Sequence, residues 1–248
     1  MFFATILKIF KQYRLNPMET REIIHLREVK SFVRRQRRLT QRLEAAMEAL
    51  WPQYGVKIDD TELDMKTLFG RDAETILEIG FGHGDTLLPM AKANPDKNYL
   101  GIEVHEPGVA AVMAGMLEHE LTNIRVIQHD AVKILENLIA DNTFSRVHIY
   151  FPDPWQKKRH HKRRIIQADF VELLCAKLTA TGVIHCATDW QNYSEHMMSV
   201  LSGNSQLKNT MGEMQFANNA ELHLRANTKF EMRGVKLGHG VWDLVFAK

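Results

Sequence analysis

Short apolar runs alternate with longer amphipathic stretches along the chain from residue 75 onward. The apolar runs lie at 76–79, 99–102, 124–127, 147–151 and 183–187. Between them, apolar positions recur at helical spacing near 86–94, 107–121, 131–140, 165–179 and 190–202. Strands that alternate with helices in this way predict an α/β fold built on a doubly wound, mostly parallel, Rossmann-like sheet.

The C-terminal end departs from this alternation. Two stretches, 228–235 and 241–247, flank the segment 236–240, which contains two glycines. Two such stretches joined by a short glycine-containing segment predict an antiparallel hairpin at the edge of the sheet.

The N-terminal end departs from it too. Good helix formers within 19–50 predict a helix that Trp51 and Pro52 bring to an end. This predicted helix includes a basic run. We therefore divide the chain into a basic N-terminal extension over 1–55, partly helical or disordered, and an α/β domain over 56–248.

Composition indicates an ordinary globular protein, with 45% hydrophobic and 25% charged residues among 248. The two cysteines, Cys175 and Cys186, form no CxxC pair, so we expect no disulfide framework and no metal site, and a reducing cytoplasm fits best. The apolar residues 1–10 are too few to span a bilayer, and no cleavage site follows them. We expect a helical or disordered extension there, with membrane attachment as the minor alternative.

The net charge of +2 conceals two basic clusters. Residues 1–42 contain eleven Lys and Arg against three Glu, and the octamer 157–164 contains six fixed cations and no acid. Such clusters on a nearly neutral protein are typical of a surface that binds a polyanion. The alternative is a solvated charged face, which is the weaker interpretation for the octamer because of its position after the fourth predicted strand.

A glycine-rich loop, Glu78-Ile79-Gly80-Phe81-Gly82-His83-Gly84, follows the first predicted strand. Glycines at Gly80, Gly82 and Gly84 allow the backbone to turn tightly and approach a ligand closely. The acid Glu78 would repel the pyrophosphate of a dinucleotide but suits the ammonium and sulfonium groups of S-adenosylmethionine. We therefore predict that this loop binds S-adenosylmethionine.

Two further acids follow the next two predicted strands. Glu103 is placed to accept hydrogen bonds from ribose hydroxyls, and Asp130 to accept one from the adenine amino group. For each acid taken alone, and above all for Asp130, the alternative is an ordinary helix cap or exposed end. Three acids, each at the carboxyl end of a successive strand, are better explained as one ligand site at that edge of the sheet.

The fourth predicted strand leads directly into Phe151-Pro152-Asp153-Pro154-Trp155. The two prolines restrict the backbone on either side of Asp153 and so hold its carboxylate at the sheet edge. Phe151 and Trp155 can stack on a base, and the basic octamer follows at once. This combination predicts a site for a nucleic-acid substrate, where a simple strand-ending turn would need neither the aromatic residues nor the cations.

Guanine N7 suits such a site as the methyl acceptor. Its lone pair lies in the ring plane and needs no general base, so catalysis reduces to positioning and electrostatics. Transfer brings positive charge onto the purine, which a carboxylate at Asp153 would stabilise. Asp189, after the fifth predicted strand, is a second candidate for recognising the N1–H and N2–H₂ edge of guanine.

With these motifs, the sequence resembles the bacterial tRNA (guanine-N7)-methyltransferases, a family of class I S-adenosylmethionine-dependent enzymes. The resemblance covers roughly 30–248. It rests on Val33-Arg34-Arg35, Leu50-Trp51-Pro52, 78–84, 151–164, Thr188-Asp189-Trp190, Thr228-Lys229-Phe230-Glu231 and 238–244. The Pro-Asp-Pro-Trp turn with its basic run is highly specific, whereas the glycine loop is shared by a whole class of enzymes.

The resemblance implies transfer of a methyl group to N7 of guanine 46 in the tRNA variable loop, in the cytoplasm, by a monomer or homodimer. It implies that Asp153 is the catalytic residue and that the cofactor is bound by Glu78, Glu103, Asp130 and Asp153. The implied substrate contacts are Lys157, Asp189, Thr228, Lys229, Phe230 and Glu231. The implied RNA contacts are Arg159, His160, His161, Lys162, Arg163 and Arg164.

Three positions depart from the family pattern: His83, Gln156 and Met232 stand where a hydrophobic residue, a proline and an arginine are usual. None of them is one of the carboxylates, so the expected activity stands. The alternatives are a methyltransferase for another RNA position or for protein, a tRNA-binding module without a cofactor, and an NAD enzyme. A pure binding module would not need the acids after three successive strands, and an NAD enzyme would show no preference for S-adenosylhomocysteine.

Overall fold

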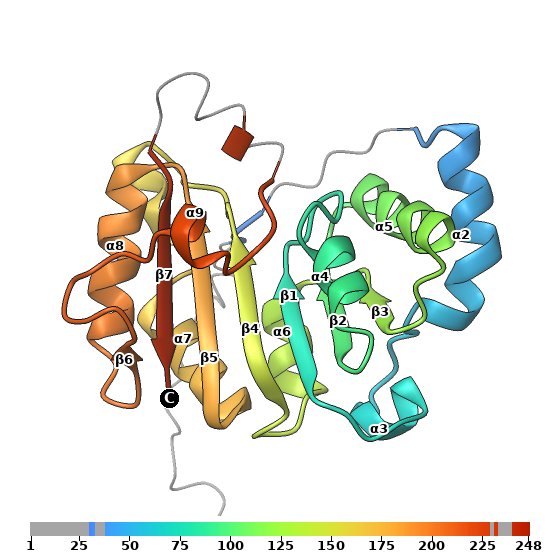
Figure 1. The fold of residues 1–248 in the computed structure, drawn as a ribbon, viewed down its shortest axis with the longest axis horizontal. Helices are drawn as coiled ribbons and strands as arrows, with labels where there is room; N and C mark the ends of the chain where they lie inside the picture. Colours follow the sequence, from blue (N-terminus) through green and yellow to red (C-terminus); the bar gives the residue numbers. More distant parts are fainter. Residues whose placement is uncertain (1–29, 33–37, 229–230, 233–239) are drawn as a thin grey trace, which may run out of the picture.

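The computed structural model describes residues 30–32, 38–228, 231–232 and 240–248. They form a seven-stranded sheet in the order β3-β2-β1-β4-β5-β7-β6 (Figure 1). The strands are β1 Thr75–Ile79, β2 Asn98–Ile102, β3 Ile124–Ile127, β4 Phe144–Tyr150, β5 Leu178–Thr188, β6 Lys208–Asn209 and β7 Trp242–Ala247. Strands β1 to β5 pair in parallel, while β7 runs antiparallel to β5 and β6. The predicted mostly parallel sheet is confirmed.

Helices cover both faces of the sheet. The helical elements are α2 Gln41–Tyr54, α3 Met65–Phe69, α4 Leu87–Ala93, α5 Glu106–His119, α6 Ala131–Asn137, the 3₁₀-helix η1 Lys158–Arg163, α7 Ala168–Lys177, α8 Gln191–Ser202 and α9 Asn219–Leu222. Residues of α2, α4 and α5 form one apolar cluster, and residues of α3, α6, α7 and α8 contribute to the other. The five helices predicted between the strands are all present.

The strand order places the ligand crevice. β1 lies between β2 and β4, so the chain winds outward from β1 in one direction through β2 and β3, and in the other from β4 onward. In open α/β sheets, ligands bind outside the carboxyl ends of the strands where the order reverses. In this sheet that point is the gap between the ends of β1 and β4.

The ends of the chain differ in detail from the prediction. Of the expected first hairpin strand, 228–235, the structure describes three residues, and two of them, Glu231 and Met232, are helical. The antiparallel neighbours of β7 are β5 and the short β6, which pairs Lys208 with Ala247. A buried hydrogen-bond network involving Glu231, described below, accounts for the helical turn.

The predicted N-terminal helix lies partly outside the described residues. The described helix α2 begins at Gln41 and continues past Pro52 to Tyr54, so the expected stop at Trp51 and Pro52 is wrong by a few residues. A proline near the end of a helix removes only one hydrogen bond of the final turns. Ala46 and Tyr54 are buried against the cluster that contains α5, so α2 packs on the α/β fold.

No helix in the described ranges is both long enough and apolar enough to cross a membrane.

Candidate active site

A cavity of about 280 Å³ opens at the carboxyl ends of β1, β2 and β4. Four of the predicted site residues line it: Gly80, Glu103, Asp130 and Asp153. Its remaining lining is Ser31, Phe32, Ile79, Ile102, Val104, His105, His129, Ala131, Ile149, Tyr150, Phe151, Pro152 and Ile165. The structure therefore gathers acids from three separate loops around one space, at the position that the strand order predicts.

The glycine loop owes its shape to left-handed backbone conformations. Gly80, Gly82 and Gly84 have φ of 72°, 55° and 81°, a region that residues with a Cβ rarely adopt. A Cβ on Gly84 would lie 2.6 Å from Val112 Cγ2, whereas one on Gly80 would meet nothing within 4 Å. Gly84 is thus required by packing as well as by φ, and Gly80 leaves open space beside the cavity.

Glu78 is the last residue but one of β1, beneath this loop, and is only 2% exposed. The hydroxyl of Thr86, at the start of α4, donates to Glu78 Oε1, while Oε2 has no hydrogen-bond partner within the described part of the chain. Burial raises the pKa of Glu78 to about 8, although Thr86 and the charge of Arg225 act in the opposite direction. A buried carboxylate oxygen without a partner is costly, which indicates that a donor outside these residues completes it.

Glu103 is fixed by three backbone N–H groups. Its Oε1 accepts from Val104 at 2.7 Å and His105 at 2.9 Å, and its Oε2 accepts from Gly82 at 3.0 Å. The carboxylate thereby ties the glycine loop to the end of β2. Since an ionised carboxylate offers about four acceptor positions, it keeps capacity for a ligand hydroxyl.

Asp130 both caps a helix and lines the cavity, so its position is compatible with each interpretation that the sequence left open. Its Oδ1 accepts from the N–H of Val132 at 3.1 Å, so it caps α6. It also lines the cavity. The cap orients the side chain at the rim and does not compete with a ligand role.

The Pro-Asp-Pro-Trp turn is entered and left through left-handed residues. Phe151 has φ of 51° and Trp155 has φ of 44°, which costs of order 1–3 kcal/mol for each such residue. The N–H of Phe151 donates to Ala187 O of β5 at 2.8 Å and so holds the first bend. Asp153 lies exposed between the two bends at the mouth of the cavity.

Trp155 carries contacts that restrict the predicted stacking role. Its indole N–H donates to Ser31 O at 3.0 Å, and the guanidinium of Arg163 lies 3.7 Å from the ring centroid. Arg163 also donates to Lys30 O and Phe32 O, at 2.9 and 3.3 Å. One face of Trp155 is therefore covered, and the pair holds residues 30–32 beside the cavity that Ser31 and Phe32 line.

The basic octamer forms η1 and divides into exposed and internal cations. Lys157, Lys158, Arg159 and Lys162 are exposed, and His160 and His161 are half-buried. Arg164 is buried: it donates to Pro154 O at 2.9 Å and to Asn192 Oδ1 at 2.7 Å, above the ring of Tyr193. The expectation that Arg164 touches RNA does not fit this position, because its donors face the interior of the fold.

Asp189 and the turn after residue 227 lie apart from the cofactor cavity. Asp189 lines a separate shallow pocket with Trp190 and Trp242, next to the end of β5. Thr228 and Glu231 are buried, and Lys229 and Phe230 lie outside the described residues. The Oγ1 of Thr228 accepts from the N–H of Glu231 at 3.0 Å, which closes the turn.

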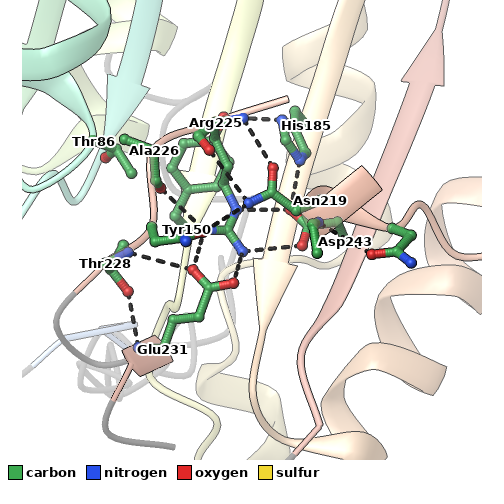
Figure 2. Close-up of polar contacts among 12 residues, drawn as sticks. Thr86, Tyr150, His185, Asn219, Arg225, Ala226, Thr228, Glu231 and Asp243 are labelled. Carbon is green, nitrogen blue, oxygen red and sulfur yellow. Dashed lines mark hydrogen bonds and ion pairs between the residues drawn. The ribbon is translucent and has the colours of Figure 1, made fainter. Parts of the chain in front are cut away.

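A row of buried polar side chains crosses one face of the sheet beside this turn (Figure 2). Register aligns Glu78 of β1 with His148 of β4, and His148 with His185 of β5. The ring of His185 has a partner at each nitrogen: its Nδ1 lies 2.9 Å from Tyr150 Oη, and its Nε2 lies 2.8 Å from Asp243 Oδ1. Burial lowers the pKa of His185, so the neutral ring donates from Nε2 to Asp243 and accepts from the tyrosine.

Arg225 is the centre of this network. Its guanidinium donates to Asp243 Oδ1 at 2.7 Å and Oδ2 at 3.0 Å, and to Glu231 Oε2 at 2.6 Å and Oε1 at 3.1 Å. Figure 2 shows it between the two carboxylates. The side chain is fully buried and lies 5.1 Å from the ring centroid of Phe151.

No motif in the sequence singled out Arg225, His185 and Asp243, although a signal for two of them was present. His185 and Asp243 interrupt the apolar runs of β5 and β7, and a polar residue in a buried strand needs a partner. Nothing in the spacing identified that partner as Arg225, which lies in an irregular segment.

Comparisons with known proteins identify the family. A family model described as "Putative methyltransferase" matches residues 72–244. A tRNA (guanine-N(7)-)-methyltransferase of Hydrogenovibrio crunogenus is 50% identical over 224 residues, covering 90% of this chain and 92% of that protein. One of the same description from Yersinia enterocolitica is 51% identical over 223 residues, covering 90% and 92%.

Solved structures support the fold alone. An antibiotic-related methyltransferase matches with a TM-score of 0.53 at 14% identity, covering 77% of this chain and 95% of that one. The 16S rRNA methyltransferase KamB matches with a TM-score of 0.53 at 13% identity, covering 86% and 95%. The sequence relatives are far closer, and they decide the family. The chain belongs to the tRNA (guanine-N7)-methyltransferase family.

Proposed function

We propose that this chain transfers the methyl group of S-adenosylmethionine to N7 of guanine 46 in the variable loop of tRNA. The observation that carries the proposal is the position of Asp153. Its carboxylate lies at the mouth of the cavity lined by Gly80, Glu103 and Asp130, and the exposed cations of η1 follow it directly in the chain. Cofactor site and polyanion site therefore meet at one residue.

The residues present fit S-adenosylmethionine. Glu78 Oε2 is a buried acceptor without a partner within the described residues, and it suits a cationic donor such as the ammonium group of the cofactor. Glu103 and Asp130 are fixed at the rim, where they would accept from ribose hydroxyls and the adenine amino group. The open space above Gly80 allows a ligand to approach the backbone. The bound cofactor supplies the electrophilic methyl group.

The chemistry asked of the protein is then positioning and charge stabilisation. Guanine N7 needs no general base, so Asp153 acts by its negative charge and by orienting the base at the cavity mouth. The two left-handed bends at Phe151 and Trp155 fix that carboxylate, because the turn between them has little freedom to rearrange.

The substrate side has two parts. The exposed cations Lys157, Lys158, Arg159 and Lys162 provide contacts to phosphates, which give affinity and register without base specificity. Base recognition falls to Asp189 and to the turn from Thr228 to Glu231, as the family resemblance implies. We further propose a cytoplasmic monomer or homodimer with a basic extension over 1–55 and a catalytic domain over 56–248; light scattering of the purified chain gives its oligomeric state.

The test is incubation with labelled S-adenosylmethionine and unmodified tRNA, followed by nucleoside analysis. We expect 7-methylguanosine, and a tRNA with adenine at position 46 should receive no label. Methylation of another nucleoside would refute the proposed acceptor. Asp153→Ala should abolish transfer and retain the melting temperature, since the side chain is exposed. Near-normal turnover of Asp153→Ala would refute its catalytic role.

A further inference from the structure

The buried network around Arg225 joins three parts of the chain that are distant in sequence. Asp243 lies on β7, Tyr150 ends β4, and Glu231 belongs to the turn that begins at Thr228. Arg225 donates to both carboxylates, and its guanidinium lies 5.5 Å from the ring centroid of Tyr150. The proposed function uses Glu231 but gives no role to Arg225.

The network is held together by charge. Burial alone would lower the pKa of Arg225 and raise that of Asp243. The hydrogen bonds and charges of Asp243 and Glu231 together outweigh burial for Arg225, and those of His185 and Arg225 together outweigh it for Asp243. Arg225 is therefore a cation between two carboxylates, and His185 adds a neutral donor to Asp243. Buried ion pairs of this kind rarely add stability over apolar packing, so their presence points to a geometric role.

We propose that Arg225 is a positioning residue for methyl transfer: anchored to Asp243, it fixes the Glu231 carboxylate and with it the turn from Thr228 to Glu231. The inference rests on the proposed function, in which that turn takes part in binding tRNA. Glu231 Oε2 also accepts from the N–H of Thr228 at 3.3 Å, so the carboxylate held by Arg225 is a second link that closes the turn, beside the bond from Glu231 N–H to Thr228 Oγ1.

Contact with Phe151 extends the effect toward the reacting groups. The guanidinium lies 5.1 Å from the Phe151 ring centroid, and Phe151 is the left-handed residue that starts the turn carrying Asp153. Arg225 thus packs against the turn that carries Asp153 and is hydrogen-bonded to Glu231 in the turn that begins at Thr228. A lysine would retain the charge, but its single ammonium cannot make paired hydrogen bonds to two carboxylates.

The test compares Arg225→Lys with a matched control, Arg125→Lys. Arg125 is a structural arginine on β3 that donates to Leu68 O at 3.0 Å and Ile124 O at 2.9 Å, away from the site. For both variants of the full chain, kcat and KM for tRNA, the Kd of S-adenosylhomocysteine and the melting temperature are measured, with kinetics well below melting.

We expect Arg225→Lys to lower kcat/KM for tRNA by about 10- to 100-fold, the usual cost of a misplaced site group. The Kd of S-adenosylhomocysteine should change by less than about threefold, because the cation beside Glu78 is kept. Arg125→Lys should lower only the melting temperature. Wild-type kcat/KM in Arg225→Lys would overturn the inference, as would an equal loss of cofactor affinity.

A double-mutant cycle tests the route through Glu231. If Arg225 acts by holding that carboxylate, Arg225→Lys combined with Glu231→Gln should lose no more activity than the worse single variant. Losses that multiply would overturn the inference. Should Arg225→Lys not fold, Arg225→Gln with Asp243→Asn replaces the ion pair by paired amides, and the same loss for tRNA is expected. A wild-type chain that makes no 7-methylguanosine refutes the proposed function itself, which distinguishes the two failures.

Discussion

The same face of the sheet is apolar on one side of β1 and polar on the other. Over β1, β2 and β3 it packs against α2, α4 and α5 through an apolar cluster that includes Ile76 and Tyr99. Over β4, β5 and β7 it carries the buried polar side chains Tyr150, His185 and Asp243. Tyr150 and Asp243 contact Arg225, which lies in the irregular segment after α9 (Figure 2). Glu78 stands at the boundary between the two.

This difference separates two tasks. The apolar half supports the glycine loop by non-directional packing, which many sequences can supply, together with the bond from Gly82 N–H to Glu103. The polar half must hold irregular turns that have no ladder of backbone hydrogen bonds of their own, and directional bonds to a few side chains do this. We therefore expect substitutions in the two halves to differ in the size of their effect and in which binding step they disturb.

The largest effect on stability should come from Asp243→Asn. The amide keeps the shape but removes the charge that pairs with Arg225, and its NH₂ group must face donors of Arg225 or His185. Removing one partner of a buried ion pair costs about 3–5 kcal/mol. Urea unfolding monitored by circular dichroism measures it, and a loss below about 0.5 kcal/mol would mean that the polar half is held by packing, like the apolar half.

The two halves also differ in how far the sequence predicted them. Glu78, Glu103 and Asp130 lie at or near the carboxyl ends of three successive apolar runs, so the strand pattern alone brought them together. Arg225 lies in an irregular segment, and its partner Asp243 is on a strand that no local pattern connects to it. Tertiary contacts of this kind leave no spacing in the sequence.

The basic octamer shows the same limit at the level of single residues. Its six fixed cations are equivalent by composition, yet four are exposed, Arg163 holds residues 30–32 and Arg164 bonds to Asn192. Arg164 turns inward to its partner Asn192, which lies 28 residues away in the chain. The sequence therefore predicted a basic surface, but not which of the six cations belong to it.

The next effect is on tRNA binding. Changing the four exposed cations Lys157, Lys158, Arg159 and Lys162 to Gln should weaken binding and reduce the slope of log K against log salt by about 0.7–0.9 for each phosphate that is no longer neutralised. The melting temperature should stay unchanged, since none of the four is buried. Titrations at several salt concentrations measure the slope.

A matched control uses two exposed lysines that lie away from η1. Lys66 on α3 and Lys92 on α4 are exposed and remote from the cavity, so their change to Gln should leave the slope near its wild-type value. An unchanged slope in the η1 variant would place the RNA surface elsewhere.

Glu78, at the boundary between the two halves, should have a smaller effect than the η1 cations, and this effect on cofactor binding should depend on pH. Burial raises its pKa from 4.5 to about 8, so its stabilising contribution is complete below pH 4.5 and is lost as the pH rises through 8. A bound cofactor ammonium favours the carboxylate, so binding of S-adenosylhomocysteine at pH 6.5 should release about one proton. Calorimetry in buffers of different ionisation enthalpy measures the release. Glu78→Gln should abolish it, and equal release in that variant would assign the proton to another group.

The smallest effect comes from one substitution made in both halves, Tyr→Phe at a buried tyrosine. Tyr150 Oη donates to His185 Nδ1, so Tyr150→Phe leaves a buried acceptor unpaired and should cost about 1–3 kcal/mol. Tyr99 on the apolar side has a buried hydroxyl with no partner in the described part of the chain, so Tyr99→Phe should be neutral within about 0.5 kcal/mol or stabilising. Both variants lose one oxygen atom, and urea unfolding compares them directly. Equal losses would show that hydrogen bonding does not distinguish the two halves, because the two substitutions differ chiefly in the partner that each hydroxyl has.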